Sequence, residues 1–379
     1  MDLKQKALEF HKINKGKIAT SITTPIKNRE DLSLAYTPGV GLVSKEIAEN
    51  KELVYEYTIK GHTVAVITDG SAVLGLGNIG PEAALPVMEG KAALFKTFGG
   101  VDAFPICLGT QDTQEIVNAV RLLSPVFGGI NLEDISAPRC FEIEDSLQDL
   151  GIPVMHDDQH GTAVVVLAGL INAQEVVGKQ MRDLVVMISG AGAAGNAVTK
   201  LIVDLVKEVR IADSKGLIYE GRGNLDLYKQ ELAKITNPDK IKGDLKEGLK
   251  GADVFIGVSA PNLLGFDDIG LMNERSIVFA MANPIPEIMP DEARRGGAYV
   301  VATGRADFPN QINNSLAFPG IFKGALESRA TKITNKMKLA AAYALAKLVE
   351  HPTPEKIIPG PFDEGVVEVV SSAVSSNVQ

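Results

Sequence analysis

The sequence predicts an α/β protein built from two domains, each with a largely parallel sheet. The 379 residues exceed the length at which a single hydrophobic core usually stops growing. Short apolar runs alternate with longer amphipathic segments, and this order of elements gives parallel strands covered by helices. A glycine-rich turn follows one apolar run in the second half, which is typical of a Rossmann-like domain.

The first domain is expected over residues 1–159. Its buried strands are predicted from three apolar runs, TVAVIT (63–68), VDAFPI (101–106) and IPVMH (152–156). Helical periodicity between these runs predicts helices over 81–97, 111–123 and 138–150. A further strand-like run, VFGGIN, begins at position 126 and leads directly to a pair of acidic residues.

The second domain is expected over residues 160–379, as a Rossmann-like unit with a helical tail. A helix is predicted over 161–177, and the continuous apolar run at 184–189 predicts a strand that is covered on both faces. Further strands are predicted at 209–213, 252–259 and 276–282. The tail from Thr331 is predicted to form a long amphipathic helix, TNKMKLAAAYALAKLVE (334–350), that can pack on either domain.

The net charge of −9 argues against nucleic-acid and anionic-membrane partners, because an acidic surface attracts neither. The N-terminus lacks the apolar run of a signal peptide, and the most apolar stretch, 162–173, is too short to span a bilayer. We therefore expect a cytoplasmic protein that acts on small molecules. Cys107 and Cys140 lie outside any CxxC pattern, so neither a disulfide framework nor a thiolate metal site is predicted.

The glycine-rich turn predicts a dinucleotide site. Gly190, Gly192 and Gly195 match G-x-G-x-x-G, with Ala193 and Ala194 completing the loop, and the match lies between a predicted buried strand and a predicted helix. In that context the glycines permit a tight turn, and the helix N-terminus offers unpaired N–H groups to a pyrophosphate. The alternative is a glycine turn that binds nothing.

Asp213 ends the strand after the glycine turn, where a carboxylate accepts hydrogen bonds from the ribose hydroxyls of NAD. This position favours NAD over NADP. Lys215 and Arg222 lie just beyond it and could meet a 2′-phosphate instead, so NADP stays possible. Asp213 could also be no more than a solvated residue at a strand end.

Two acidic pairs follow two predicted strands of the first domain. Glu133 and Asp134 follow one strand, and Asp157 and Asp158 follow another at the start of a helix. Four carboxylates at the same edge of a sheet would repel one another unless a cation neutralised them. The oxygen ligands favour Mg²⁺ or Mn²⁺. The alternative is that Asp157 or Asp158 merely caps the helix.

His156 and His160 flank the second acidic pair, and we assign neither a metal role, because isolated histidines more often serve as hydrogen-bonding residues.

Seven motifs, in order along the chain, resemble those of malic enzymes, specifically the short prokaryotic form. They extend from about Leu32 to Gly324: SLAYTPGV (33–40), TDGSAVLGLGNIGP (68–81), MEGKAALF (88–95), NLEDI (131–135), HDDQHGTA (156–163), GAGAAG (190–195) and QINNSLAFPGIF (311–322). The resemblance implies a substrate and metal domain followed by an NAD(P)-binding domain. It also implies oxidation of malate, followed by decarboxylation to pyruvate.

The resemblance assigns roles to individual residues. It implies that Glu133, Asp134 and Asp158 bind the metal, and that Asp157 supports a nearby lysine. That lysine, Lys91, corresponds to the general base, and Tyr36 corresponds to the general acid. Asparagines matching those that touch the substrate carboxylates are Asn283, which also adjoins the cofactor, and Asn313 and Asn314.

Neither Lys91 nor Tyr36 would be chosen without the resemblance, because a helical lysine is usually a surface charge and a tyrosine before Thr37 and Pro38 usually anchors a turn. To act as a base, Lys91 needs a pKa well below the ordinary value of about 10.4, and a buried position beside a cation is expected to lower it.

One position departs from the family. In the larger eukaryotic malic enzymes the loop after TDG carries an arginine that pairs with a substrate carboxylate, whereas this chain has Ser71 and Ala72 there. The contact must come from elsewhere, for example from backbone N–H groups of 75–80 or from a partner subunit. A homodimer is expected from the resemblance and from the prevalence of twofold assemblies.

Two other functions stay open at this point. The protein could act mainly as a metal-dependent oxaloacetate decarboxylase, because the second half-reaction needs no hydride transfer. It could also be a nonenzymatic sensor that binds NAD without turnover. The joint presence of Tyr36, Lys91, Glu133, Asp134 and Asp158 counts against the sensor, because a degenerate relative is expected to lose at least one of them.

Overall fold

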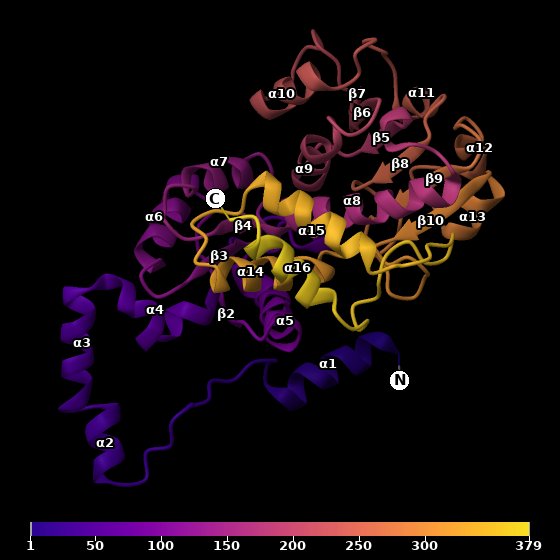
Figure 1. Ribbon diagram of the computed structural model, residues 1–379. Helices are drawn as coiled ribbons and strands as arrows, with labels where there is room; N and C mark the ends of the chain where they lie inside the picture. The colour runs from indigo at the N-terminus through magenta and orange to yellow at the C-terminus, as the bar shows by residue number, and fades with distance from the viewer. Residues whose placement is uncertain (1, 379) are drawn as a thin grey trace.

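The first half of the chain contains a parallel four-stranded sheet in this computed structural model, which describes residues 2–378 (Figure 1). The strand order is β2-β1-β3-β4. Leu132 pairs with both Ile67 and His156, so β1, β3 and β4 end in register at one edge. The strands are β1 (Thr63–Thr68), β2 (Asp102–Cys107), β3 (Gly129–Leu132) and β4 (Val154–His156).

The second half contains a six-stranded sheet with the order β10-β9-β8-β5-β6-β7, in which only the β6–β7 pairing is antiparallel. Strand order reverses between β5 and β8, and this switch point is where ligands bind in doubly wound sheets. The predicted α/β fold is confirmed. The strands are β5 (Val185–Ser189), β6 (Glu208–Asp213), β7 (Gly216–Leu217), β8 (Val254–Gly257), β9 (Ser276–Ala280) and β10 (Ala298–Thr303).

Helices cover both sheets. Those of the first half are α1 (Leu3–Asn14), α2 (Arg29–Ala35), α3 (Gly39–Glu49), α4 (Val54–Tyr57), α5 (Pro81–Gly99), α6 (Thr113–Leu123) and α7 (Arg139–Ser146). Those of the second half are α8 (Asp157–Val177), α9 (Ala193–Ile202), α10 (Leu227–Ile235), α11 (Leu245–Leu249), α12 (Phe266–Ile269), α13 (Pro290–Arg295), α14 (Phe318–Glu327), α15 (Asn335–Lys347) and α16 (Val366–Ser375). Short 3₁₀ turns lie at Lys51–Leu53, Ile59–His62, Leu74–Leu76, Met181–Asp183 and Asn314–Leu316.

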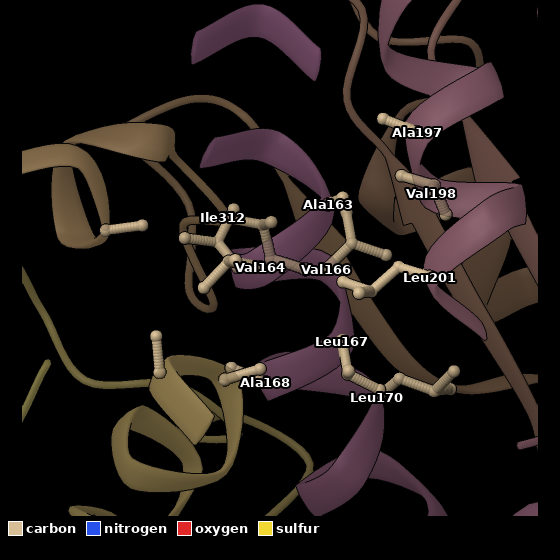
Figure 2. Close-up of a cluster of buried hydrophobic side chains, with 14 of the residues drawn as sticks. Ala163, Val164, Val166, Leu167, Ala168, Leu170, Ala197, Val198, Leu201 and Ile312 are labelled. Atoms are coloured by element: carbon tan, nitrogen blue, oxygen red, sulfur yellow. The ribbon is translucent and has the colours of Figure 1, made fainter. Parts of the chain in front are cut away.

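Helix α8 is the central helix of the molecule. It begins at Asp157, four residues before the predicted start, and is 21 residues long. Most of its side chains are buried against α9, α15 and the strands (Figure 2). Among residues 2–378 it alone is long and apolar enough to cross a membrane by length and composition, because the helix extends beyond the apolar stretch 162–173 noted in the sequence. However, 67% of its apolar window is buried inside the protein.

One hydrophobic cluster reaches from the first sheet to the second. It includes Val66 on β1, Phe95 on α5 and Ile188 on β5. The ring of Phe95 packs edge-on against Phe318 and Phe322 of α14, with centroids 4.6 Å and 5.5 Å away. The C-terminal segment therefore joins the core of the first domain.

The C-terminal segment contains two helices: α15 confirms the predicted tail helix at 334–350, whereas α16 was not predicted. Helix α15 packs on α8, whereas α16 packs on both α14 and α15. A Cβ at Gly324 would lie 2.4 Å from the carbonyl oxygen of Ser371, so only glycine permits this approach of α14 and α16.

The N-terminal segment extends away from the rest of the molecule (Figure 1). Helices α1 to α4 contain no buried residue. Apolar side chains on this segment are nevertheless numerous, and those exposed include Leu3, Leu8, Ile13, Leu34 and Leu42. We call residues 2–50 the N-terminal arm. An exposed apolar surface of this kind is typical of a contact region for another chain.

Candidate active site

The carboxylates lie at the edge of the first sheet where β3 and β4 end. Glu133 directly follows β3, and Asp157 directly follows β4 as the first residue of α8. Strand pairing in register brings the two loops together, because the carboxyl ends of parallel strands share one edge. The predicted convergence of the two acidic pairs is therefore what the structure shows.

Glu133, Asp134 and Asp158 form the most compact acidic group. Each offers one oxygen, and these oxygens lie within 4.8 Å of one another. Asp134 adopts a left-handed backbone conformation with φ of 52°, which is uncommon outside glycine and asparagine. Its backbone N–H donates to Oδ2 of Asp158 at 2.9 Å, so the two loops are fixed to each other.

These three carboxyl groups fit a divalent cation. Burial and the neighbouring negative charges raise the pKa of Glu133, Asp134 and Asp158 above their usual ranges. Oδ2 of Asp134 is buried without a hydrogen-bond partner. An all-oxygen set of clustered carboxylates with an unused buried oxygen matches what Mg²⁺ or Mn²⁺ requires.

Lys91 of α5 lies beside this group. Its Nζ is 2.6 Å from Oδ2 of Asp157 and 2.8 Å from Oε1 of Glu133. Burial acts to lower the pKa of Lys91, but the charges of Asp157, Glu133 and Asp158 outweigh it and hold that pKa above its ordinary value. The neighbouring carboxylates thus raise the pKa of Lys91, whereas a lowered pKa was expected from the sequence.

Asp157 is completely buried and does not cap α8. The residue before the helix, His156, makes no side-chain capping bond, and Oδ2 of Asp158 accepts from Asp134 instead. The helix-cap alternative is therefore wrong. A Cβ at Gly161 would lie 1.8 Å from Oδ1 of Asp157, so the absence of a side chain at Gly161 makes room for this carboxylate.

A cleft of about 550 Å³ joins the carboxylate group to the second domain. Lys91, Glu133, Asp134 and Asp158 line one side of it. Its other walls include Gly75, Ala194, Ser259, Ala282, Asn283, Asn313 and Asn314. The structure therefore brings the predicted asparagines to the same cleft as the acidic group.

The cleft contains no arginine among its described lining residues, and Lys91 is its one cation. Ser71, at the departure from the eukaryotic pattern, is buried and donates through Oγ to Asp69. Arg139 also binds Asp69, at 2.7 Å, and so is held outside the cleft. Gly75 is the only residue of the predicted glycine-rich stretch 75–80 that lines the cleft.

The glycine loop lies at the switch point between β5 and β8. Gly190 has φ of 110° and lies so close to β8 that a Cβ would be 2.7 Å from the carbonyl oxygen of Val258. A Cβ at Gly195 would overlap Gly190, whereas the space around Gly192 is open. The loop thus combines a tight turn, close packing of the helix and an accessible backbone, as dinucleotide binding requires.

Both halves match family models, that of the malic enzyme N-terminal domain over residues 15–115 and that of the malic enzyme NAD-binding domain over residues 159–378. The chain belongs to the malic enzyme family. It is 55% identical to the bifunctional malic/malolactic enzyme of Bacillus subtilis, over 99% of this chain and 93% of that protein. It is 56% identical to the NAD-dependent malic enzyme of Geobacillus stearothermophilus, over 95% and 76%.

Solved malic enzymes have the same fold. The NAD-dependent malic enzyme of Thermotoga maritima is 52% identical, with a TM-score of 0.94 over 97% of this chain and 98% of that one. The malic enzyme of Entamoeba histolytica is 41% identical, with a TM-score of 0.95 over 98% and 80%. The resemblance is thereby confirmed: the protein is an oxidoreductase that oxidises and decarboxylates malate with a nicotinamide dinucleotide.

The carboxylate of Asp213 in this malic enzyme lies beside two cationic side chains. It accepts from Arg222 at 2.7 Å and from the backbone N–H of Lys215 at 2.9 Å, and Nζ of Lys229 lies 3.2 Å away. Burial acts to raise the pKa of Asp213, but the bonds from Arg222, Lys215 and Lys229 lower it below its usual range. The sequence had indicated Lys215 and Arg222 but not Lys229.

Tyr36 lies apart from the cleft. It follows α2 on the N-terminal arm, is 66% exposed and is not among the described residues that line the cleft. Figure 1 shows α2 well separated from α5, which carries Lys91. Within a single copy of this malic enzyme, Tyr36 is therefore not brought to the other predicted catalytic residues.

Two side chains near the cleft were not predicted from the sequence. Glu287 is fully buried and accepts the backbone N–H groups of Ser259 and Ala282, both at 3.0 Å. It thereby fixes the loops after β8 and β9 that line the cleft. Asn131 donates to Oε2 of Glu133 at 2.8 Å. No sequence motif marked Glu287, although a buried acid in an apolar run after ANPIP was a possible signal.

Proposed function

We propose that this malic enzyme converts (S)-malate to pyruvate and CO₂ with reduction of NAD⁺, that it depends on Mg²⁺ or Mn²⁺, and that it works as a cytoplasmic homodimer. The observation that carries the proposal is the position of Lys91 between Asp157 and Glu133, in a cleft that the glycine-loop domain also lines. This arrangement supports a proton acceptor, an ion site and a dinucleotide loop acting around one space.

The residues that would hold the ion are Glu133, Asp134 and Asp158, because their oxygens cluster within 4.8 Å. When bound, the ion would supply positive charge beside the substrate's hydroxyl and carboxylate, and the dinucleotide would supply the hydride acceptor. Gly190, Gly192, Ala193, Ala194 and Gly195 would hold the pyrophosphate at the start of α9.

Lys91 is the residue proposed to move protons. With the ion bound, its charge would offset the carboxylates that raise the pKa of Lys91, and the neutral amine would take the proton of the C2 hydroxyl as malate is oxidised, while Asp157 holds Nζ of the lysine in place. The centroid of the Phe318 ring lies 4.3 Å from Nζ of Lys91, so this ring covers one side of the ammonium group. Asn313 and Asn314 orient the carboxylates of malate, and Asn283 contacts both substrate and cofactor.

Tyr36 is proposed to protonate the carbon left by CO₂, acting in the cleft of a second copy of the chain. Two observations support this assignment. The N-terminal arm has no buried residue and exposes apolar side chains, and Tyr36 itself is 66% exposed. A homodimer in which each arm packs on its partner would bury this surface and complete both sites.

NAD is proposed as the preferred cofactor. The carboxylate of Asp213 would accept the ribose hydroxyls and repel a 2′-phosphate. Arg222 and Lys229 partly offset that repulsion, so NADP would also turn over, more slowly. Relatives carry both descriptions: the Geobacillus stearothermophilus enzyme, 56% identical, is NAD-dependent, whereas the malic enzyme of Halomonas elongata, 45% identical over 98% of this chain and 92% of that one, is NADP-dependent.

The experiment follows the absorbance of the reduced dinucleotide with purified protein, (S)-malate, Mn²⁺ and either NAD⁺ or NADP⁺, with a chelator control. Metal-dependent reduction with equal amounts of pyruvate supports the proposal. Loss of CO₂ from added oxaloacetate without malate oxidation would support the decarboxylase alternative. Cofactor binding without any turnover would support the sensor. A lactate assay checks whether the malolactic activity named for the Bacillus subtilis relative also occurs.

A further inference from the structure

A second cavity of about 300 Å³ lies between α7, α8, α9 and the start of α15. It is separate from the catalytic cleft, because α8 presents opposite faces to the two spaces. At 3.6 residues per turn, the three residues of α8 that line the cavity project from a different side of the helix than the three that line the cleft. The cavity residues of α8 are Gln159, His160 and Ala163, and its cleft residues are Asp158, Thr162 and Val165.

Two buried hydrogen-bond donors line this cavity. Lys338 of α15 is 8% exposed, and its Nζ makes a single described contact, with Nδ1 of His160 at 3.2 Å. Asn196 of α9 is 2% exposed, and its Nδ2 has no hydrogen-bond partner. An unpaired buried amide is costly, and such groups in folded proteins usually meet a ligand or water.

The acidic residues of the cavity do not neutralise these donors. Glu144 already accepts the backbone N–H of His156 at 3.1 Å, Nε2 of Gln159 at 2.9 Å and the ring of His160. Asp145 and Lys200 are both exposed, and Lys200 forms an ion pair with Glu231 at 3.4 Å.

The Lys338 ammonium is therefore short of counter-charge. Burial lowers the pKa of Lys338, and the attraction of Glu144 offsets only part of that effect. An anion beside the ammonium would supply the missing charge. The lining is mixed: polar side chains such as Gln148, Gln159 and His160 share it with an apolar part formed by Met155, Ala163, Ala197, Leu201 and Tyr228.

We propose that this cavity is a binding site for a small organic carboxylate with an apolar body. The carboxylate accepts from Nζ of Lys338 and Nδ2 of Asn196, and the body packs on Met155, Leu201 and Tyr228. The cavity volume of about 300 Å³ is at the lower end of those of small-molecule sites and exceeds what a bare inorganic anion fills.

The test measures binding of benzoate to the full chain by ligand-observed NMR titration, with benzamide as a neutral probe of the same shape and acetate as a carboxylate without the body. Lys338→Met removes the charge and keeps the chain length. Lys347→Met is the matched control, because Lys347 is an exposed lysine of the same helix. Asn196→Leu removes the unpaired amide. Circular dichroism checks that each variant is folded.

The expected result is benzoate binding at least about tenfold tighter than benzamide or acetate. This preference persists in Lys347→Met and in the presence of saturating malate and NAD⁺, and it disappears in Lys338→Met. Equal binding of benzoate and benzamide, or displacement of benzoate by malate, would overturn the proposal. If Lys338→Met does not fold, Asn196→Leu decides: unchanged affinity overturns the proposal and weakened affinity supports it. Because turnover is not measured, this outcome is independent of the catalytic proposal.

Discussion

Nζ of Lys91 lies 2.6 Å from Oδ2 of Asp157, and both side chains are buried. They come from α5 and α8, two helices that are separated along the chain by β2, α6, β3, α7 and β4. The lysine is thus held by a carboxylate that is completely buried. Small displacements of either helix would move the proposed proton acceptor relative to malate, and misplacements of about 1 Å can cost on the order of 100-fold in rate.

Lys91→Met is expected to reduce the turnover number by about 10² to 10⁴, the usual contribution of a positioned acid or base. Binding of the reduced dinucleotide, followed by its fluorescence, is expected to stay close to the wild type. Lys96→Met on the same helix is the control, because Lys96 is exposed and pairs only with Asp102. A turnover number within threefold of the wild type would remove Lys91 from its proposed role.

Gly161→Ala is expected to destabilise the fold by about 1 to 3 kcal/mol, because the added methyl group meets Oδ1 of Asp157 at 1.8 Å. The displaced carboxylate is also expected to lower turnover. Gly169→Ala on the same helix is the control, since its Cβ would meet the ends of side chains at ordinary or slightly short distances, Ile312 at 3.2 Å and Ile357 and Phe279 at 3.5 Å. Urea unfolding of both variants checks the difference, and equal stabilities would contradict the close approach.

Mn²⁺ is expected to raise the free energy of unfolding of the wild type, by about 2.7 kcal/mol at a concentration 100 times its dissociation constant. Asp134→Asn and Asp158→Asn are expected to lose most of this stabilisation, because each removes a charged ligand. Thermal unfolding with Mn²⁺ and with a chelator provides the measurement. Stabilisation that survives in both variants would place the ion elsewhere.

Asp213→Ser is expected to shift the ratio of kcat/KM for NADP⁺ to that for NAD⁺ by about 10- to 100-fold toward NADP⁺, equivalent to about 1.4 to 2.8 kcal/mol. Removal of the carboxylate leaves Arg222 and Lys229 free to meet a 2′-phosphate. Asp226→Ser is the control, because Asp226 also adjoins Lys229 but caps α10. An unchanged cofactor ratio would show that Asp213 does not face the ribose.

Mixing two inactive variants tests the assignment of Tyr36 to a second copy. In a dimer of Tyr36→Phe with Lys91→Met, one cleft would carry both defects and the other neither. Random exchange of subunits is therefore expected to restore about one quarter of wild-type activity. If Tyr36 acted within its own chain, every cleft would carry one defect and mixing would restore nothing.

Acid is expected to destabilise the protein partly through Asp253. Its carboxylate accepts from Lys179 at 2.7 Å and from the backbone N–H of Val185 and Nδ2 of Asn273, both at 2.9 Å. Burial acts to raise the pKa of Asp253, but these bonds lower it below its usual range. A lowered pKa contributes stability above the unfolded value of about 3.9, and this contribution is lost as the pH falls through the folded value.

Asp253→Asn is therefore expected to cost about 1 to 3 kcal/mol at neutral pH, and the difference from the wild type is expected to shrink below about pH 4. Urea unfolding across this range is the measurement. A difference that stays constant with pH would show that the ionised carboxylate is not the stabilising group.

Much of the fold follows from local patterns. The run TVAVIT forms β1 over the predicted residues, and the rule that parallel strands end at one edge correctly brings Glu133 near Asp158. Helix α16 could not be predicted in the same way. Its sequence is rich in valine, which carries weak helix propensity, and only packing against α14 and α15 makes it helical.

The start of α8 and the charge of Lys91 also lay beyond local reasoning. An aspartate before an apolar run reads equally well as a cap or as a first-turn residue, and the contact of Asp158 with Asp134 decides between them. The pKa of Lys91 depends on which carboxylates surround it in space. The surroundings of Tyr36 were the hardest to predict, because the cleft proposed for it belongs to a second copy of the chain.

Helix α8 also determines how the two halves can move. Its first turn carries Asp157 and Asp158, and its later turns pack on α9 and α15. The chain thus passes from the first sheet to the second through a continuous helix and not through a flexible loop. Any movement of the glycine loop toward the substrate would therefore shift the acidic edge as well, so opening the cleft would also displace the carboxylates that are proposed to hold the ion.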